Sequence, residues 1–149
     1  MTGGLNSVCI DASLALAWLF YDNCREQSDY LWKKWRQDEV AMVVPPMFHA
    51  EVTSVIRRNV YFNNILPEEG ERLFTVFNGL PVEVISSRYV YRGAWQLARE
   101  YNLPVCYDMQ YLAVAELEDC EFWTLDRKLI NAVGNKNQRV RWVGGINVS

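Results

Sequence analysis

Short apolar runs alternate with helical patterns along the chain, and this alternation is the feature that most restricts its fold. The runs that are short enough and apolar enough to be strands are Ser7–Ile10, Val40–Val44, Pro81–Ile85, Glu121–Leu125 and, as a last strand at the sheet edge, Arg139–Val143. The segments between them carry apolar residues at the spacing of one helical face. Strands that alternate with helices form βαβ units. The sequence therefore predicts an α/β fold with a mainly parallel sheet and helices on both faces.

Acidic residues recur where the predicted strands end and helices begin. Asp11 directly follows the first strand, and Asp126 directly follows the strand at 121–125. Glu51 lies on the helix after the second strand, between Phe48 and Val55, and so faces the core side of that helix. Because ligands bind at the carboxyl ends of parallel strands, we expect these acids to converge at one edge of the sheet.

The fourth acid, Asp108, stands at the start of another predicted helix. Leu103-Pro104 separates this helix from the preceding one, since a residue before proline disfavours the helical conformation. Tyr111, Leu112 and Ala115 then follow Asp108 at the spacing of one helical face. Asp108 is therefore placed at the first turn, where its carboxylate can either cap the helix or serve the same site as the other acids.

A cluster of acids needs a compensating charge. Two carboxylates about 4 Å apart repel by roughly 4 kcal/mol at an effective dielectric constant of 20. No lysine or arginine stands beside Asp11 or Asp108 in the sequence. The natural partner is a hard divalent cation, Mg²⁺ or Mn²⁺, whose remaining ligands are water and substrate phosphate. Such a site is typical of enzymes that hydrolyse phosphate esters, and the sequence has neither a Ser/His/Asp arrangement nor a glycine-rich phosphate loop.

Length, charge and composition indicate the number of domains, the mode of nucleic-acid binding and the location of the protein. A length of 149 residues predicts one domain over 1–149, and a net charge of −3 argues against coating of nucleic acid by bulk positive charge. The chain has no apolar run of membrane-spanning length and no signal-peptide pattern at its start, so we expect a cytoplasmic protein. The scattered cysteines are expected to be reduced and mostly buried: Cys9, Cys24, Cys106 and Cys120.

At this point the sequence resembles a known family, the PIN domain, and within it the VapC-type toxin ribonucleases. The matching stretches are Asp11-Ala12-Ser13, Pro45 through Glu51 with Arg57, Tyr107-Asp108 through Glu116, and Thr124 through Leu129. The resemblance implies a single PIN-like domain with a five-stranded parallel sheet. It also implies an endoribonuclease that binds Mg²⁺ or Mn²⁺, acts on single-stranded RNA, forms a homodimer and is inhibited by a small antitoxin protein.

The resemblance also assigns roles to residues. Asp11, Glu51, Asp108 and Asp126 take the catalytic, metal-binding positions. Thr124 takes an auxiliary position near the fourth acid. Ser13, which the local pattern favours as the cap of the first helix, is a second auxiliary residue. Arg127 and Lys128 either contact RNA phosphates or are simply solvated.

Several residues admit a purely structural interpretation. Asp11, Asp108 and Asp126 each look like a helix cap, and Glu51 can pair with Arg57 on its own helix. His49 lies two residues from Glu51, so the two side chains point apart, and a general-base role is disfavoured. Aromatic residues in polar surroundings favour protein interfaces over base stacking; these are Trp32, Trp35, Tyr61, Tyr89 and Tyr91.

Two other classes of function compete with the nuclease. The chain can be a catalytically silent PIN module that binds RNA or a protein partner, although all four acids are present. It can also be a phosphoacceptor of the receiver type or a phosphatase with an aspartate nucleophile. Both of the latter require further acids near Asp11, and Ser13 stands where the phosphatase requires one.

Overall fold

A parallel five-stranded sheet forms the centre of the molecule in the computed structural model, which describes residues 6–20 and 24–148. The strands are β1 (Ser7–Ile10), β2 (Ala41–Val44), β3 (Val82–Val84), β4 (Glu121–Thr124) and β5 (Val140–Trp142). Their order is β3-β2-β1-β4-β5, and all four neighbouring pairs are parallel. The predicted α/β class and the edge position of the last strand are confirmed.

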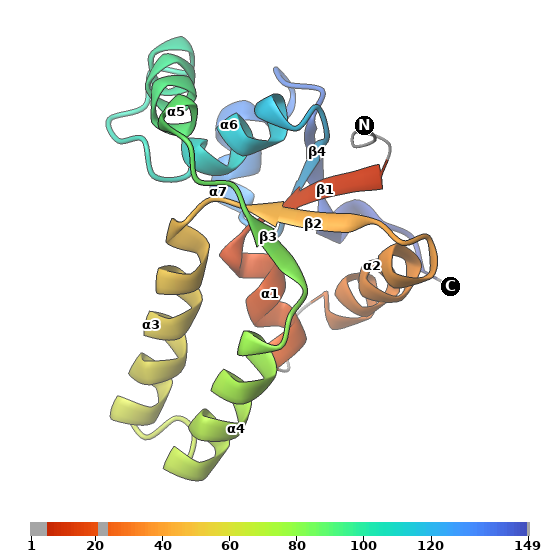
Figure 1. Ribbon diagram of the computed structural model, residues 1–149, viewed down its shortest axis with the longest axis vertical. Helices are drawn as coiled ribbons and strands as arrows, with labels where there is room; N and C mark the ends of the chain where they lie inside the picture. Colours follow the sequence, from red (N-terminus) through yellow and green to blue (C-terminus); the bar gives the residue numbers. More distant parts are fainter. Residues whose placement is uncertain (1–5, 21–23, 149) are drawn as a thin grey trace.

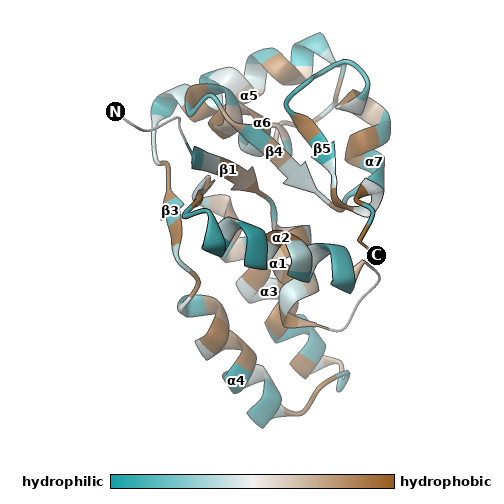
Figure 2. Ribbon diagram, turned by 90° about the vertical axis from the view of Figure 1, so that its right-hand side faces the viewer, coloured by the Kyte–Doolittle hydropathy of each residue, from teal (hydrophilic) through white to brown (hydrophobic). Residues whose placement is uncertain are grey.

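Helices cover both faces of this sheet (Figure 1). They are α1 (Ala12–Leu19), α2 (Arg25–Gln37), α3 (Met47–Tyr61), α4 (Pro67–Asn78), α5 (Arg88–Glu100), α6 (Met109–Leu117) and the short α7 (Arg127–Leu129), which continues into a π-helical turn at Ile130–Gly134. Helices α5 and α6 lie on one side of the sheet and α1 and α2 on the other, while α3 and α4 extend away from it as a hairpin (Figures 1 and 2). A 3₁₀ turn, Val143–Gly145, follows β5.

The apolar residues of the central strands explain this layering. Cys9 and Ile10 on β1, Val44 on β2 and Phe122 on β4 are completely buried. Neighbouring residues of a strand point to opposite faces, so burial of both Cys9 and Ile10 requires cover on each side. The brown segments at the middle of Figure 2 show this core between the two helical layers. Among the described residues, no helix is both long enough and apolar enough to cross a bilayer.

Helix α6 is more deeply buried than its sequence pattern predicts. The pattern indicated a single apolar face, but Met109, Ala113 and Val114 are buried along with that face. The reason is that α5 packs against the second side of α6: a Cβ added to Gly93 of α5 would lie 3.0 Å from the Cβ of Ala113. Apolar residues on more than one face are expected for a helix packed between another helix and the sheet.

Some side chains differ from their predicted exposure. Trp35 was expected at a surface, yet it is only 5% exposed and packs edge-on against Trp123 at 6.2 Å. Trp32 is half-buried against Trp18. All four cysteines are free, but only two of them are buried: Cys9 and Cys120. Tyr61, Tyr89 and Tyr91 are exposed as predicted.

The close contact between α5 and α6 gives a stability test. Replacing Gly93 with valine places a branched side chain against Ala113, so we expect a loss of about 1 to 3 kcal/mol in the free energy of unfolding, measured by urea denaturation. The control is Gln96→Val on the exposed side of the same helix, which we expect to change stability by about 0.5 kcal/mol or less. Equal losses in the two variants would mean that the contact is not tight.

Candidate active site at the carboxyl edge of the sheet

The order in which the chain adds strands to the sheet reverses beside β1. After β1 the chain passes to β2 on one side, whereas β4 lies on the other side and leads to β5. In open α/β sheets, ligands bind in the crevice outside the carboxyl ends of the strands at such a reversal. Asp11 follows β1 directly, and Asp126 comes two residues after the end of β4. These two predicted acids therefore occupy the position where this fold class binds ligands.

Asp11 is buried and held by several hydrogen bonds. Its side chain is the cap of α1 and accepts a bond from the Leu14 N–H at 3.3 Å. The hydroxyls of Ser13 and Thr124 each donate to this carboxylate, at 2.5 Å. The prediction that Ser13 caps the helix is therefore wrong: Asp11 is the cap, because its carboxylate can reach the third residue on, and Ser13 lies in the first turn.

Thr124 and Ser13 connect the ends of β1 and β4. The Thr124 hydroxyl, besides donating to Asp11, accepts a bond from the Asp126 N–H at 2.9 Å. The Ser13 hydroxyl accepts one from the Leu125 N–H at 3.0 Å. Asp126 in turn accepts bonds from the N–H groups of Lys128 and Leu129 at 3.0 and 3.2 Å, which caps α7. The two auxiliary residues thus fix the relative positions of two of the acids.

Asp108 and Glu51 are held differently. Asp108 occupies the cap position of α6, but its backbone is helical and its carboxylate accepts no capping bond. The simple cap interpretation is therefore wrong for this residue. Glu51 is half-buried on α3 and accepts a hydrogen bond from the Tyr111 hydroxyl at 2.5 Å. Tyr111 itself is 1% exposed and stacks on Phe122, with ring centroids 5.8 Å apart.

The four carboxylates interact electrostatically. Burial raises the pKa of Asp11 to about 6, and the charge of Asp126 adds to the rise, while the bonds from Ser13, Thr124 and Leu14 oppose it. Burial also raises the pKa of Asp108, again with a contribution from Asp126. The pKa of Glu51 is raised by burial and by Asp108, against the effect of the Tyr111 hydroxyl. The acids therefore form a chain of mutual repulsion: Asp11, Asp126, Asp108 and Glu51.

No ion pair among the described residues compensates for this repulsion. None of the ion pairs found among residues 6–20 and 24–148 involves one of the four acids. Arg57, the expected partner of Glu51, instead lies over the ring of Tyr61, 5.7 Å from its centroid. A site rich in carboxylate oxygen, whose acids make no ion pair within the described residues, is chemically suited to a hard divalent cation.

The spacing of the acids restricts what kind of cation site this is. No group of three His, Cys, Asp or Glu side chains within the described part of the chain is arranged as a ready metal cage. Mg²⁺ rarely needs one, because it keeps several waters and binds through one or two carboxylates together with substrate phosphates. The residues present therefore fit a hydrated Mg²⁺ or Mn²⁺ ion rather than a fully enclosed one.

The basic residues expected near the site have separate positions. Lys128 and Asp108 both line a small hollow of about 160 Å³, together with Leu103 and Pro104. Arg127 is exposed, with its guanidinium stacked 4.0 Å from the centre of the Trp142 ring. His49 lies against Phe48 and Phe77, at 5.2 and 5.3 Å between ring centroids. This supports the interpretation of His49 as a packing residue.

Tyr111 is the residue of this site that the sequence analysis missed. It was counted as part of an apolar helical face, yet its hydroxyl is the group that holds Glu51. A buried tyrosine hydroxyl needs a hydrogen-bond partner. A tyrosine on the inward face of a central helix, three residues after a site acid, was the available signal.

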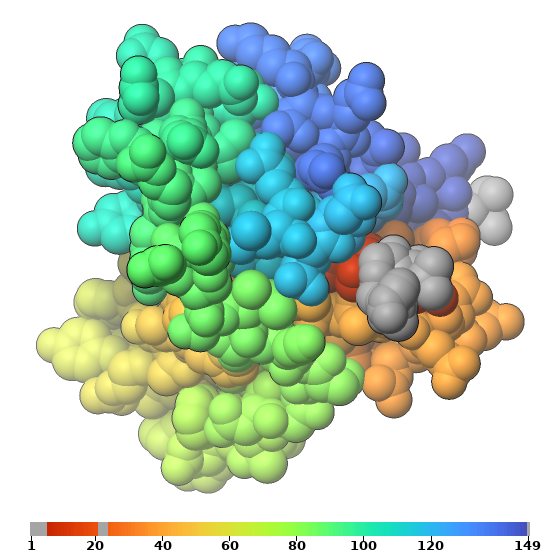
Figure 3. All heavy atoms as spheres, turned by 45° about the horizontal axis from the view of Figure 1, so that its top comes forward, coloured from red at the N-terminus to blue at the C-terminus, as the bar shows by residue number. Residues whose placement is uncertain are grey.

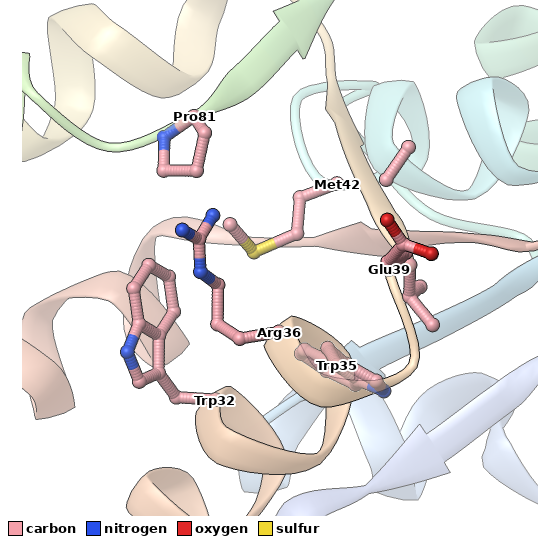
Figure 4. A pocket seen from close by; sticks show the side chains of 8 residues that line it. Trp32, Trp35, Arg36, Glu39, Met42 and Pro81 are labelled. Carbon is pink, nitrogen blue, oxygen red and sulfur yellow. The ribbon is translucent and has the colours of Figure 1, made fainter.

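A larger hollow lies elsewhere on the molecule. Its lining includes Trp32, Arg36, Met42 and Pro81, and its volume is about 370 Å³ (Figure 4). Met42 is near the start of β2 and Pro81 immediately precedes β3, so this hollow is at the amino edge of the sheet. Arg36 lies over Trp32, 5.5 Å from its ring centroid, with its head toward Pro81 (Figure 4). This hollow is therefore separate from the four acids.

Comparison with known proteins agrees with this geometry. The family model described as the PIN domain matches residues 8–135, which is most of the chain, so the chain belongs to the PIN domain family. No curated protein matches it. The stretches that suggested this family from sequence lie within the matched region.

Three solved structures share the fold at low sequence identity. PAE2754 from Pyrobaculum aerophilum is 17% identical with a TM-score of 0.67, over 93% of this chain and 84% of that one. A toxin–antitoxin complex from Klebsiella pneumoniae is 17% identical with a TM-score of 0.64, over 90% and 95% of the two chains. VapBC2 from Rickettsia felis, bound to a DNA fragment from its promoter, is 13% identical with a TM-score of 0.64, over 91% and 98%.

The raised pKa of Asp11 predicts a pH dependence of stability. The folded pKa of about 6 exceeds the usual 3.8, so the folded state binds more protons between these values. The free energy of unfolding in EDTA should therefore fall by about 3 kcal/mol as pH rises from about 4 to 7. Asp11→Asn should flatten this profile and be the more stable protein at pH 7 in urea denaturation, whereas Asp38→Asn at an exposed position should follow the wild type. If the free energies of unfolding of Asp11→Asn and wild type change with pH in the same way, the pKa of Asp11 is not raised in the folded protein.

The bonds made by Thr124 predict a second effect. Thr124→Val removes a donor to Asp11 and the acceptor of the Asp126 N–H, so we expect a loss of about 1 to 3 kcal/mol in urea denaturation at pH 7. Thr75→Val is the matched control: its hydroxyl bonds to the Glu71 carbonyl on an exposed helix face and should change stability little. A Thr124 variant as stable as this control would show that the bridge contributes nothing.

Proposed function

We propose that this protein is a metal-dependent endoribonuclease of the PIN family that hydrolyses phosphodiester bonds in RNA. PIN domains are generally nucleases, and the family is assigned by the match over residues 8–135. The observation that carries the proposal is the state of Asp108: its carboxylate begins a buried helix without capping it and is repelled by Asp126. A cation bound at this carboxylate would offset the repulsion between the two acids.

The proposal gives each residue a role. Asp11, Glu51, Asp108 and Asp126 hold a hydrated Mg²⁺ or Mn²⁺ ion, directly or through its waters. When bound, the ion supplies a water of lowered pKa and stabilises charge on the phosphate. Thr124 and Ser13 hold Asp11 in place, and Tyr111 holds Glu51. Lys128, which shares a hollow with Asp108, would contact a phosphate, whereas Arg127 would do so only from its stacked position on the Trp142 ring.

We further propose that the protein is the toxin of a toxin–antitoxin pair, acting in the cytoplasm as a homodimer built from one PIN domain over residues 1–149. Two of the solved structures that share its fold come from such systems. The far end of the α3–α4 hairpin exposes apolar side chains, among them Tyr61, Phe62 and Leu66. A cluster of large exposed apolar residues such as this one is typical of a surface that binds a protein partner.

A catalytically silent module that binds RNA or protein is the second candidate. The observation in its favour is that no three acids within the described residues form a ready metal cage. Cleavage and metal binding therefore have to be measured separately.

The test is cleavage of a labelled RNA with single-stranded loops, in Mn²⁺ or Mg²⁺ and in EDTA. We expect wild-type cleavage only with metal, and a loss of at least a hundredfold in Asp108→Asn, the scale on which loss of a catalytic group acts. Asp38→Asn, which removes an exposed acid at the end of α2, should cut like the wild type.

Two results would decide against the nuclease. Equal cutting by wild type and Asp108→Asn would place the activity on other residues or on a contaminant. No cutting of several RNAs, together with a metal-dependent rise in melting temperature, would favour the silent module.

A further inference from the structure

One face of α5 carries a row of basic and aromatic side chains. Arg88, Arg92, Trp95 and Arg99 follow one another at intervals of four, three and four residues, which places them on one side of the helix. All four are exposed, Trp95 by 57%, and Tyr91 beside them is exposed by 58%. We call these five residues the α5 strip. In Figure 3, α5 (green to teal) forms the outer surface of the molecule on this side.

The α5 strip is held outward by the packing of the opposite face. Val90, Ala94, Leu97 and Ala98 are buried, and Gly93 lies directly against Ala113 of α6. Helix α5 therefore cannot turn to bury Trp95 or Tyr91 without opening the core. The exposed aromatic rings belong to the rigid surface of the protein, and they lie on a different face from the partly buried Trp32 and Trp18.

The charge of the strip is positive, and its arginines make no ion pair with any described residue. No ion pair found in the described part of the chain involves Arg88, Arg92 or Arg99. Arg88 lies over the Tyr89 ring at 5.4 Å from its centroid. The one acid on α5, Glu100, is its last residue. A protein of net charge −3 thus has a local basic surface interleaved with aromatic rings.

The strip begins near the edge of the sheet that carries the candidate active site. Gly93 meets Ala113, and Glu100 and Glu116 interact electrostatically, so α5 and α6 run in the same direction. Helix α5 begins four residues after β3 ends at Val84, and the Ile85 N–H donates to the Val44 carbonyl at the carboxyl end of β2. The first turn of α5 therefore lies near the carboxyl edge of the sheet, and the strip runs from there over roughly 16 Å of helix.

We propose that the α5 strip is a binding track for single-stranded RNA, which guides the strand to or from the acidic site. Guanidinium groups pair with phosphates and stack on bases, and exposed aromatic rings stack on unpaired bases. A second copy is a poor occupant, because a two-fold contact through this face would set arginine against arginine. The proposal rests on the nuclease function in naming RNA as the ligand.

The electrostatic part is tested by binding in EDTA, where no metal-dependent cleavage occurs. Fluorescence anisotropy of a labelled single-stranded RNA is measured against salt for wild type, Arg92→Gln/Arg99→Gln and the control Arg58→Gln/Arg72→Gln, which removes two exposed cations from α3 and α4. The strip variant should bind at least fivefold more weakly at low salt, and its slope of log K against log salt should be smaller by about 1.4, since each cation contributes about 0.7 on a single strand. The control should match the wild type. Equal affinities in all three proteins would overturn the proposal.

The stacking part is tested at Trp95. Bound RNA should quench tryptophan fluorescence in the wild type and much less in Trp95→Phe, which keeps a stacking ring and most of the affinity. Trp95→Ala should weaken binding by about fivefold or more, the scale of one lost base stack, while Tyr61→Ala at the exposed end of α3 should not. Unchanged quenching in Trp95→Phe would show that no base approaches this ring.

Cleavage kinetics separate this proposal from the nuclease assignment. If the enzyme cuts RNA, Arg92→Gln/Arg99→Gln should raise KM and leave kcat unchanged. If the protein cleaves RNA but the strip variants have the RNA affinity and KM of the wild type, the binding track is refuted and the nuclease proposal stands. If the strip variants lose RNA affinity but the wild type cleaves no RNA, the binding track is supported and the nuclease proposal is refuted. Strip variants that bind RNA normally but lose a protein partner would show that the face is a protein interface instead.

Discussion

The hydrogen bonds around the buried carboxylate of Asp11 determine the arrangement of the rest of the site. They join the cap of α1 to the end of β4, through the hydroxyls of Thr124 and Ser13. The same threonine positions the backbone of Asp126, so two acids from distant parts of the chain have a fixed relation. A buried ionised group is costly unless it is bonded in this way. Removal of either hydroxyl would therefore affect both the geometry of the edge and the charge on Asp11.

The core compensates for the repulsion among the acids. Asp11, Asp108 and Glu51 all have raised pKa values, with burial as the first cause in each. This cost is tolerated because six of the nine residues of α6 are buried, packed between α5 and the sheet. Tyr111 on this helix belongs both to the core and to the acidic site, because its ring packs on Phe122 and its hydroxyl donates a hydrogen bond to Glu51. Stability in this molecule comes from its apolar layers, and the repulsion among the acids reduces it.

Helix α5 shows how one element can serve the core and a surface at once. Its small and apolar residues fit against α6, which leaves its large and charged residues facing outward. The tyrosines at 89 and 91 were expected to mark a protein interface. Their neighbours on the folded helix are arginines, and this combination is the basis for proposing that the face binds nucleic acid.

The sequence by itself determined the alternation of strands and helices, the parallel sheet and the positions of Asp11 and Asp126 at its edge. These follow from local patterns: apolar runs of strand length, helical spacing and an aspartate directly after a strand. It did not determine that Asp11 rather than Ser13 caps α1, that Asp108 caps nothing, or that Trp35 is buried. Nor did it show the bond between Tyr111 and Glu51, which are sixty residues apart. Such contacts depend on which helices pack together, and only the tertiary structure decides that, because local spacing shows which face of a helix is apolar but not which residue lies opposite it.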